Sequence, residues 1–97
     1  MATYVSLVNW TEQGAKGYSD SITRSKDAAK AAEAMGGKFL SVFWTMGPYD
    51  VVAIIEFPDD ESASAYALKL GAQGNVRTVT MRAYSSSEME RIIAKTK

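Results

Sequence analysis

Asp50 is the side chain whose sequence context best suits acid–base catalysis. It precedes an apolar run, Val51–Phe57, that is interrupted only by Glu56. Asp50 would therefore stand at the beginning of a buried strand, where its carboxylate could act as a general base. It could instead accept hydrogen bonds from the turn backbone or pair with Arg77 or Arg82. We favour this structural role, because no acid partner stands at helical or hairpin spacing from Asp50. Asp50 is thus the only candidate for a catalytic residue, and a structural role is the one that we favour for it.

Arg77 and Arg82 could bind an anionic group. They lie five residues apart on one predicted strand, so their side chains point to opposite faces of the sheet. One arginine could face a cleft and hold an anion through two parallel hydrogen bonds, while the other forms an ion pair at an interface or beside a helix. The sequence leaves open which of the two faces the cleft.

Aromatic residues in or beside the predicted strands could line a ligand pocket. Aromatic side chains in strands are more often core or interface anchors, so this interpretation competes with a purely structural one. Two of them, together with Asp50, Asn75 and the two arginines, form a set of candidate ligand-binding residues near strand ends. These candidates are Trp10, Tyr49, Asp50, Asn75, Arg77 and Arg82.

No metal site and no cofactor are predicted. The acidic cluster of residues 59–61 follows Pro58 at a helix start, where carboxylates cap the helix and complement its dipole. The chain contains no cysteine and no histidine, which excludes thiolate nucleophiles, iron–sulfur clusters, Ser-His triads and the usual axial haem ligand. The chemistry open to this chain is therefore restricted to carboxylates, hydroxyls, amides and cationic side chains.

Charge and hydropathy argue against nucleic-acid and membrane partners. Eleven basic and eleven acidic residues give a formal net charge of zero, and phosphate binding needs a basic surface. No apolar run approaches the roughly 20 residues that span a bilayer. Residues 1–10 do not resemble a secretory leader, so we expect a cytoplasmic protein.

The residues above must be positioned by a single domain that covers residues 1–97. Strands are predicted over residues 3–10, 39–45, 49–57 and 76–84, from their β-branched and aromatic content. Residues 11–19 are predicted to form a loop, because they contain two glycines. Ser21 is expected to cap a helix through residue 35, Asp59 to cap a second helix that Gly71 stops, and Ser85 with Glu88 to open a short C-terminal helix as a capping box.

This order is β-α-β-β-α-β with a C-terminal helix, the ferredoxin-like plan of the α+β class. Right-handed crossovers place the first and third strands in the centre of a four-stranded antiparallel sheet. Those two strands carry apolar residues on both faces, yet two helices cover only one face. We therefore expect the other face to be covered by a second copy of the chain, and we predict a homo-oligomer.

Several short motifs occur in order over almost the full length of the chain. They are Asn9-Trp10-Thr11 with Gly14, Gly36-Gly37, Thr45-Met46-Gly47-Pro48-Tyr49-Asp50, Gly71, Gly74-Asn75-Val76-Arg77-Thr78 and Arg82-Ala83. With them the chain resembles the GYD-domain proteins, small bacterial and archaeal domains of largely unassigned function. The Gly, Tyr and Asp of the family name are present, although Pro48 separates Gly47 from Tyr49. The resemblance implies a dimeric α/β-barrel architecture.

Three functional hypotheses follow. The first is a homo-oligomer, a dimer or larger, that binds a small metabolite in a cleft between sheet and helices. The second is a cofactor-independent enzyme of the monooxygenase type, with Asp50 as base and Trp10 or an arginine as orienting group. The third is a structural protein that closes into a ring or cage through its C-terminal helix. We rank binding or assembly ahead of catalysis, because no two residues form an evident acid–base pair.

Overall fold

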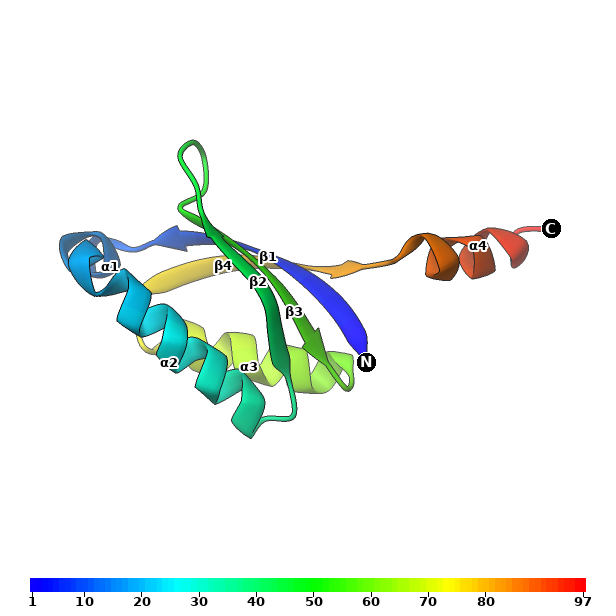
Figure 1. Cartoon of the computed structure of the whole chain (residues 1–97), viewed down its shortest axis with the longest axis horizontal. Coiled ribbons are helices and arrows are strands. Elements are labelled where there is room, and N and C mark those ends of the chain that lie inside the picture. Colours follow the sequence, from blue (N-terminus) through cyan, green and yellow to red (C-terminus); the bar gives the residue numbers. More distant parts are fainter.

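Four strands and two long helices form two layers, and the short C-terminal helix extends from one end (Figure 1). The computed structural model describes residues 1–97. In chain order the elements are β1 Ala2–Trp10, α1 Glu12–Lys16, a 3-10 helix Tyr18–Asp20, α2 Ser21–Ala34, β2 Lys38–Trp44, β3 Val51–Phe57, α3 Asp60–Ala72, β4 Val76–Ala83 and α4 Ser86–Ala94. The predicted α+β, ferredoxin-like order is confirmed.

The sheet is antiparallel with the strand order β2-β3-β1-β4, so β1 and β3 are its central strands as predicted. Leu7 of β1 lies opposite Val52 of β3 on one side and opposite Val79 of β4 on the other. Helices α2 and α3 both lie on the same side of the sheet (Figure 1). The opposite face is covered by no other element of the chain.

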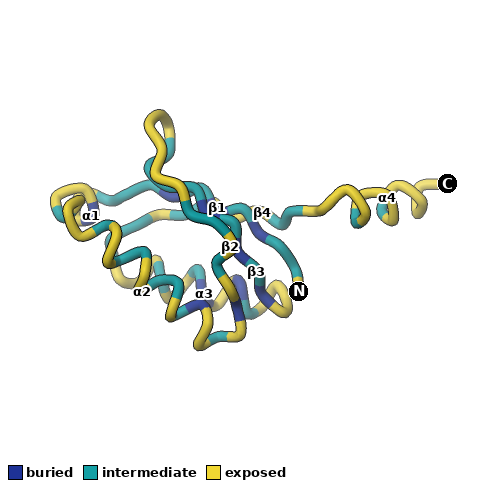
Figure 2. Tube along the Cα trace, in the orientation of Figure 1, coloured by how far each residue is buried: buried dark blue, intermediate teal, exposed yellow.

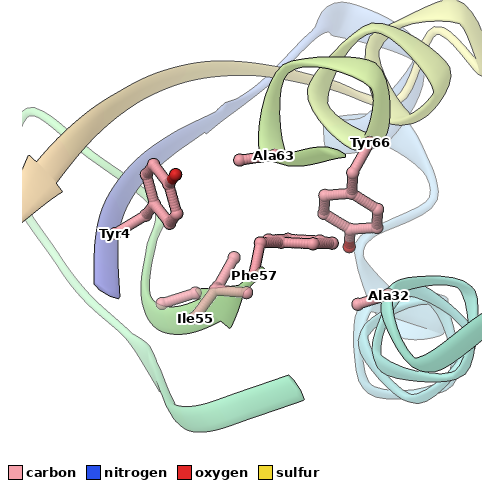
Figure 3. Close-up of a cluster of buried hydrophobic side chains, with 7 residues drawn as sticks. Tyr4, Ala32, Ile55, Phe57, Ala63 and Tyr66 are labelled. Atoms are coloured by element: carbon pink, nitrogen blue, oxygen red, sulfur yellow. The ribbon is translucent and has the colours of Figure 1, made fainter. Parts of the chain in front are cut away.

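The core lies between the sheet and the two long helices (Figures 2 and 3). Phe57 is its most buried large side chain, with 1% of its surface exposed. Its ring contacts those of Tyr4 and Tyr66, at centroid separations of 6.4 and 5.2 Å. Ala32 of α2 and Ala63 of α3 are small enough to bring both helices close to these rings.

Residues 11–19 are not a loop, and this prediction was wrong. Thr11 caps α1 by accepting a hydrogen bond of 3.2 Å from the N–H of Gly14. Gly14 is buried against the backbone of Asn75, where a Cβ atom would stand 2.0 Å from the Asn75 carbonyl oxygen. The glycine that suggested a flexible loop is thus a contact point between two distant segments.

Three predicted boundaries also shift. Ser21 is the first residue of α2 rather than its N-cap. Asp20 is the N-cap residue, and its side chain forms no capping hydrogen bond. Gly71 does not stop α3, which continues to Ala72, while Gly74 takes the left-handed conformation with φ of +83°. β3 begins at residue 51, so residues 49 and 50 belong to the hairpin connection.

The other two helix caps agree with the predictions. The Asp59 side chain accepts a hydrogen bond of 2.7 Å from the N–H of Ser62. Ser85 and Glu88 form a complete capping box at the start of α4. This helix extends away from the two-layered body, and most of its surface is exposed (Figures 1 and 2).

Candidate functional site

A cavity of about 100 Å³ lies between the sheet and the helices α2 and α3. It has room for several water-sized spheres, since one such sphere needs about 10–15 Å³. Its walls are mostly apolar, and they combine aliphatic side chains with six aromatic rings. The aromatic residues that line it are Tyr4, Trp10, Phe39, Trp44, Phe57 and Tyr66.

The cavity exists because α2 contributes small or polar residues to the surface that faces the sheet. Ser21, Arg24, Ser25 and Ala28 line the cavity at the i, i+3, i+4 and i+7 spacing of one helical face. In an ordinary amphipathic helix these positions carry large apolar side chains that fill the space above the sheet. Here they leave space, and they add hydroxyl and guanidinium groups to its lining.

One end of the cavity is polar. We use the term polar end for Arg24, Gln73 and Asn75, which line the cavity where β1 ends and β4 begins. The Gln13 side-chain amide donates to the Asn75 side-chain oxygen at 2.8 Å, which leaves the Asn75 NH₂ group free to donate. Thr11 fixes the same turn, because its N–H donates to the Asn75 carbonyl at 3.1 Å and its hydroxyl to the Gly74 carbonyl at 2.6 Å.

Arg24 links α2 to the C-terminal end of α1. Its Nη1 donates to the Gly17 carbonyl at 2.7 Å and its Nη2 to the Gly14 carbonyl at 3.1 Å. The side chain is half-buried and forms no ion pair with any carboxylate. Sequence reasoning missed Arg24, although the Ser-x-x-Arg-Ser-x-x-Ala spacing on the inner face of α2 could have revealed it.

Of the predicted ligand-binding residues, Trp10 and Asn75 come together at the cavity. Asp50 does not line it. The Asp50 carboxylate accepts a hydrogen bond of 2.9 Å from the Trp10 N–H, and its own N–H donates to the Val8 carbonyl at 2.9 Å. The partner of the Asp50 carboxylate is thus a backbone group of β1 rather than the turn backbone or an arginine. Tyr49 lies in the hairpin, where its carbonyl accepts from the Thr45 hydroxyl at 2.6 Å.

The two arginines of β4 point to opposite faces, as predicted. Arg77 is exposed, and the residues beside it, Val76 and Thr78, are the ones that line the cavity. Arg77 therefore lies on the uncovered face of the sheet. Arg82 lies on the helix side, outside this cavity, and lines a second, more open pocket together with Tyr4.

Arg82 is the centre of a polar cluster at the other end of the sheet. Its guanidinium lies 3.8 Å from an Asp60 carboxylate oxygen and 3.9 Å from a Glu88 carboxylate oxygen. It also lies over the rings of Tyr4 and Tyr84, at 5.7 and 4.8 Å from their centroids. This arginine is occupied by protein partners on several sides.

Tyr4, Tyr66 and Glu88 have shifted pKa values. Burial raises the pKa of Tyr4 to about 12, and the hydrogen bond that its hydroxyl donates to Asp60 adds to the shift. Burial also raises the pKa of Tyr66 to about 12. The capping hydrogen bonds with Ser85 lower the pKa of Glu88. At neutral pH both tyrosine hydroxyls are therefore protonated, and Glu88 is ionised.

The chain is similar to known proteins in both sequence and fold. The model of the GYD domain family matches residues 4–93. A protein of Thermus thermophilus, named glutamine synthetase and cystathionine beta-lyase binding protein, is 27% identical over 90 residues, which cover 92% of this chain and 95% of that protein.

The crystal structure of TTHA0845 from Thermus thermophilus is similar in fold. It superimposes with a TM-score of 0.56 at 23% sequence identity and covers 89% of this chain and 96% of that chain. At this identity the likeness establishes the shared fold. In the present structure, none of the helices has the length and apolar character that crossing a membrane requires.

Proposed function

This chain belongs to the GYD domain family, and from this premise we propose that it is a homo-oligomeric binding protein that holds a small molecule between its sheet and its helices. The observation that carries the proposal is the cavity itself, which combines aromatic walls with one polar end. Ligand pockets in proteins have this composition, in which apolar walls supply affinity and a few polar groups orient the ligand.

The ionisable groups around the cavity favour binding over catalysis. Only Arg24 and the tyrosines Tyr4 and Tyr66 can ionise among the residues that line it. Both tyrosines have a pKa of about 12 and are poor bases or nucleophiles at neutral pH. The monooxygenase alternative requires Asp50 as base, but the Asp50 carboxylate accepts the backbone N–H of Trp10.

Tryptophan fluorescence tests the proposal directly. The chain has two tryptophans, and both Trp10 and Trp44 line the cavity, so a bound molecule should change their emission. Ala67 of α3 also lines the cavity, whereas Ala65 of the same helix is exposed. We expect small aromatic probes to change the emission of the wild-type protein and of Ala65→Leu, but not of Ala67→Leu. Probes that bind Ala67→Leu as well as wild type would refute the cavity as the site.

The uncovered face of the sheet supports the homo-oligomer. It carries a continuous apolar row across all four strands, in which neighbours are register partners: Phe43, Val52, Leu7 and Val79. Phe43 and Val79 are more than half exposed, at 62% and 51%. Large exposed apolar patches are typical of protein interfaces.

Charges at the two ends of this face suit a second copy of the chain. Arg77 lies beside Asn9 at one end of the sheet, and Glu56 beside Thr3 at the other. These ends are roughly 20 Å apart along β1. A twofold axis that reverses the strand direction brings the end of the sheet that carries Arg77 in one protomer onto the end that carries Glu56 in the other, twice per dimer. We infer that the face is a self-complementary dimer interface.

Assembly through α4 is a second candidate function. Its apolar residues Met89, Ile92 and Ile93 follow one face of a helix that extends from the body (Figure 1). An isolated helix of this length is marginal in water, so a surface on a neighbouring copy would stabilise it. The name of the Thermus relative, which describes a protein that binds two enzymes, supports protein contact as a role of this kind of domain.

Truncation tests this candidate. Removal of residues 86–97 should lower the assembly mass measured by light scattering, while Met89→Lys should do the same without shortening the chain. Glu90→Lys, which changes an exposed residue next to Met89, is the control and should leave the mass unchanged. An unchanged mass for both the truncation and Met89→Lys rules out α4 as an assembly element.

A further inference from the structure

Arg24 carries the only formal charge on the cavity lining, and no carboxylate balances it. The lining residues include no aspartate, glutamate or lysine. The ion pairs of the structure join Lys16 with Glu12 and Arg82 with Asp60 and Glu88, and none includes Arg24. The cavity therefore presents a positive charge at its polar end.

The hydrogen bonds of Arg24 hold the guanidinium in place without neutralising it. A guanidinium has five N–H donors, and Nη1 and Nη2 each donate one to the carbonyls of Gly17 and Gly14. Three N–H groups remain for another partner. Because Arg24 is half-buried beside an apolar space, an unpaired charge there is less well solvated than on an open surface.

Neutral donors surround this charge. Ser21 and Ser25 present hydroxyls on the same face of α2 as Arg24, and Asn75 has a free NH₂ group because Gln13 binds its oxygen. These groups can donate hydrogen bonds into the cavity, and none of them brings a negative charge. The polar end is therefore built to receive an acceptor with negative charge.

We propose that the ligand of this cavity is a small aromatic carboxylate, with its carboxylate on Arg24 and its ring among the aromatic walls. The inference rests on the proposed binding function and names the ligand class. Arginine binds a carboxylate through two parallel hydrogen bonds, which matches the N–H groups left free. A single arginine with neutral donors suits a monoanion, and the aromatic lining suits a planar ring more than a sugar.

The test compares an acid with its neutral isostere. Phenylacetate and phenylacetamide have the same ring and nearly the same shape, and differ in charge. Titration of each against Trp10 and Trp44 fluorescence gives two dissociation constants. A charge-assisted bidentate contact predicts that wild-type protein binds phenylacetate about tenfold more tightly or better than phenylacetamide.

Substitutions in α2 test whether Arg24 causes the preference for phenylacetate over phenylacetamide. Arg24→Gln should bring the ratio of the two dissociation constants close to one while the protein still binds phenylacetamide. Arg24→Lys retains the charge and should retain part of the preference. Lys26→Gln removes the same charge from an exposed position on the same helix and should leave the ratio unchanged.

The possible results separate this inference from the proposed function. Equal binding of acid and amide by wild-type protein overturns the carboxylate inference but leaves the binding function intact. Binding of neither compound argues against both. A wild-type preference for the acid that persists in Arg24→Gln also overturns the role of Arg24. If Arg24→Gln fails to fold, the ratio of the two dissociation constants in wild-type protein and in Arg24→Lys still tests whether Arg24 binds the carboxylate.

Discussion

The Asp50 carboxylate accepts a hydrogen bond of 2.9 Å from the backbone N–H of Trp10. The two residues are separated by 40 positions in sequence, and the bond joins the β2–β3 hairpin to the last residue of β1. Trp10, the last residue of β1, also lines the cavity. The side chain that the sequence singled out as the catalytic candidate thus holds the backbone of a residue in the cavity wall.

This relationship predicts a stability defect for Asp50→Ala. The change removes the acceptor from a half-buried N–H and should lower the free energy of unfolding by about 1–3 kcal/mol in urea titrations. Asp20→Ala is the matched control, since the Asp20 side chain makes no capping bond, and it should change stability by less than about 0.5 kcal/mol. Equal stability of Asp50→Ala and wild type would argue against the structural role.

A second prediction concerns the close contact that positions the polar end. A methyl group on Gly14 would meet the Asn75 carbonyl oxygen at 2.0 Å, and neither backbone segment can move without breaking the bonds of Thr11. Gly14→Ala should therefore destabilise the protein by several kcal/mol, of the order of other overpacking substitutions. Thermal unfolding followed by circular dichroism measures the change.

The control for Gly14 is a glycine in open space. Gly71 lies within α3, and a Cβ atom there would meet nothing within 4 Å. Because alanine favours a helix over glycine by about 1 kcal/mol, Gly71→Ala should raise the melting temperature. A loss of stability in Gly71→Ala, or none in Gly14→Ala, would contradict this description of the two sites.

A third prediction is a loss of stability in alkaline solution. Tyr4 and Tyr66 have folded-state pKa values of about 12, raised from 10.0 chiefly by burial. The folded state therefore holds its tyrosine protons more tightly than the unfolded state does. Their contribution to stability is complete below pH 10 and is lost as the pH rises through about 12.

Urea titrations between pH 9 and pH 12 can measure this slope. Tyr66→Phe removes one of the two groups and should flatten it, although the loss of the hydrogen bond from Tyr66 to the Ala28 carbonyl lowers stability at every pH. Tyr18→Phe removes an exposed tyrosine and should leave the slope as in wild type. A steep alkaline slope that survives Tyr66→Phe and Tyr4→Phe together would assign it to other groups.

The fold was largely predictable because its determinants are local. The capping bonds of Asp59 and of Ser85 with Glu88 depend on residues three positions apart, and the strands on short runs of β-branched residues. The helix α1 was missed for the opposite reason. Its glycines are typical of a loop, and the reason for Gly14 is a close contact with the backbone of Asn75, which is distant in sequence.

The site was less predictable because it depends on which residues face one another. Trp10 and Asn75 were identified at strand ends, and both line the cavity. The hydrogen-bond partner of the Asp50 carboxylate depends on the pairing of strands far apart in sequence. The role of this carboxylate could therefore not be predicted from its sequence neighbours alone. Arg24 could be identified as a cavity residue only once the inward-facing side of α2 was known.

The last prediction concerns the uncovered face of the sheet. Val79 stands at the exposed edge of its apolar row, opposite Leu7, and is 51% exposed in the single chain. If a second copy covers this row, Val79→Lys would bury an unpaired charge in the interface, at a cost that dissociates the dimer. Light scattering at micromolar concentration should then show a dimer for wild type and a monomer for Val79→Lys.

Leu68→Lys provides the control because Leu68 is 76% exposed and lies on α3, on the far side of the helix layer from this face. It adds the same charge to the chain and should leave the dimer intact. Arg77→Glu adds a sharper test: it places two acidic residues together at each end of the twofold interface, and Glu56→Arg in the same chain should restore the dimer. Failure of the double variant to recover, with each single variant monomeric, would refute the proposed pairing of Arg77 with Glu56 while leaving the interface itself in place.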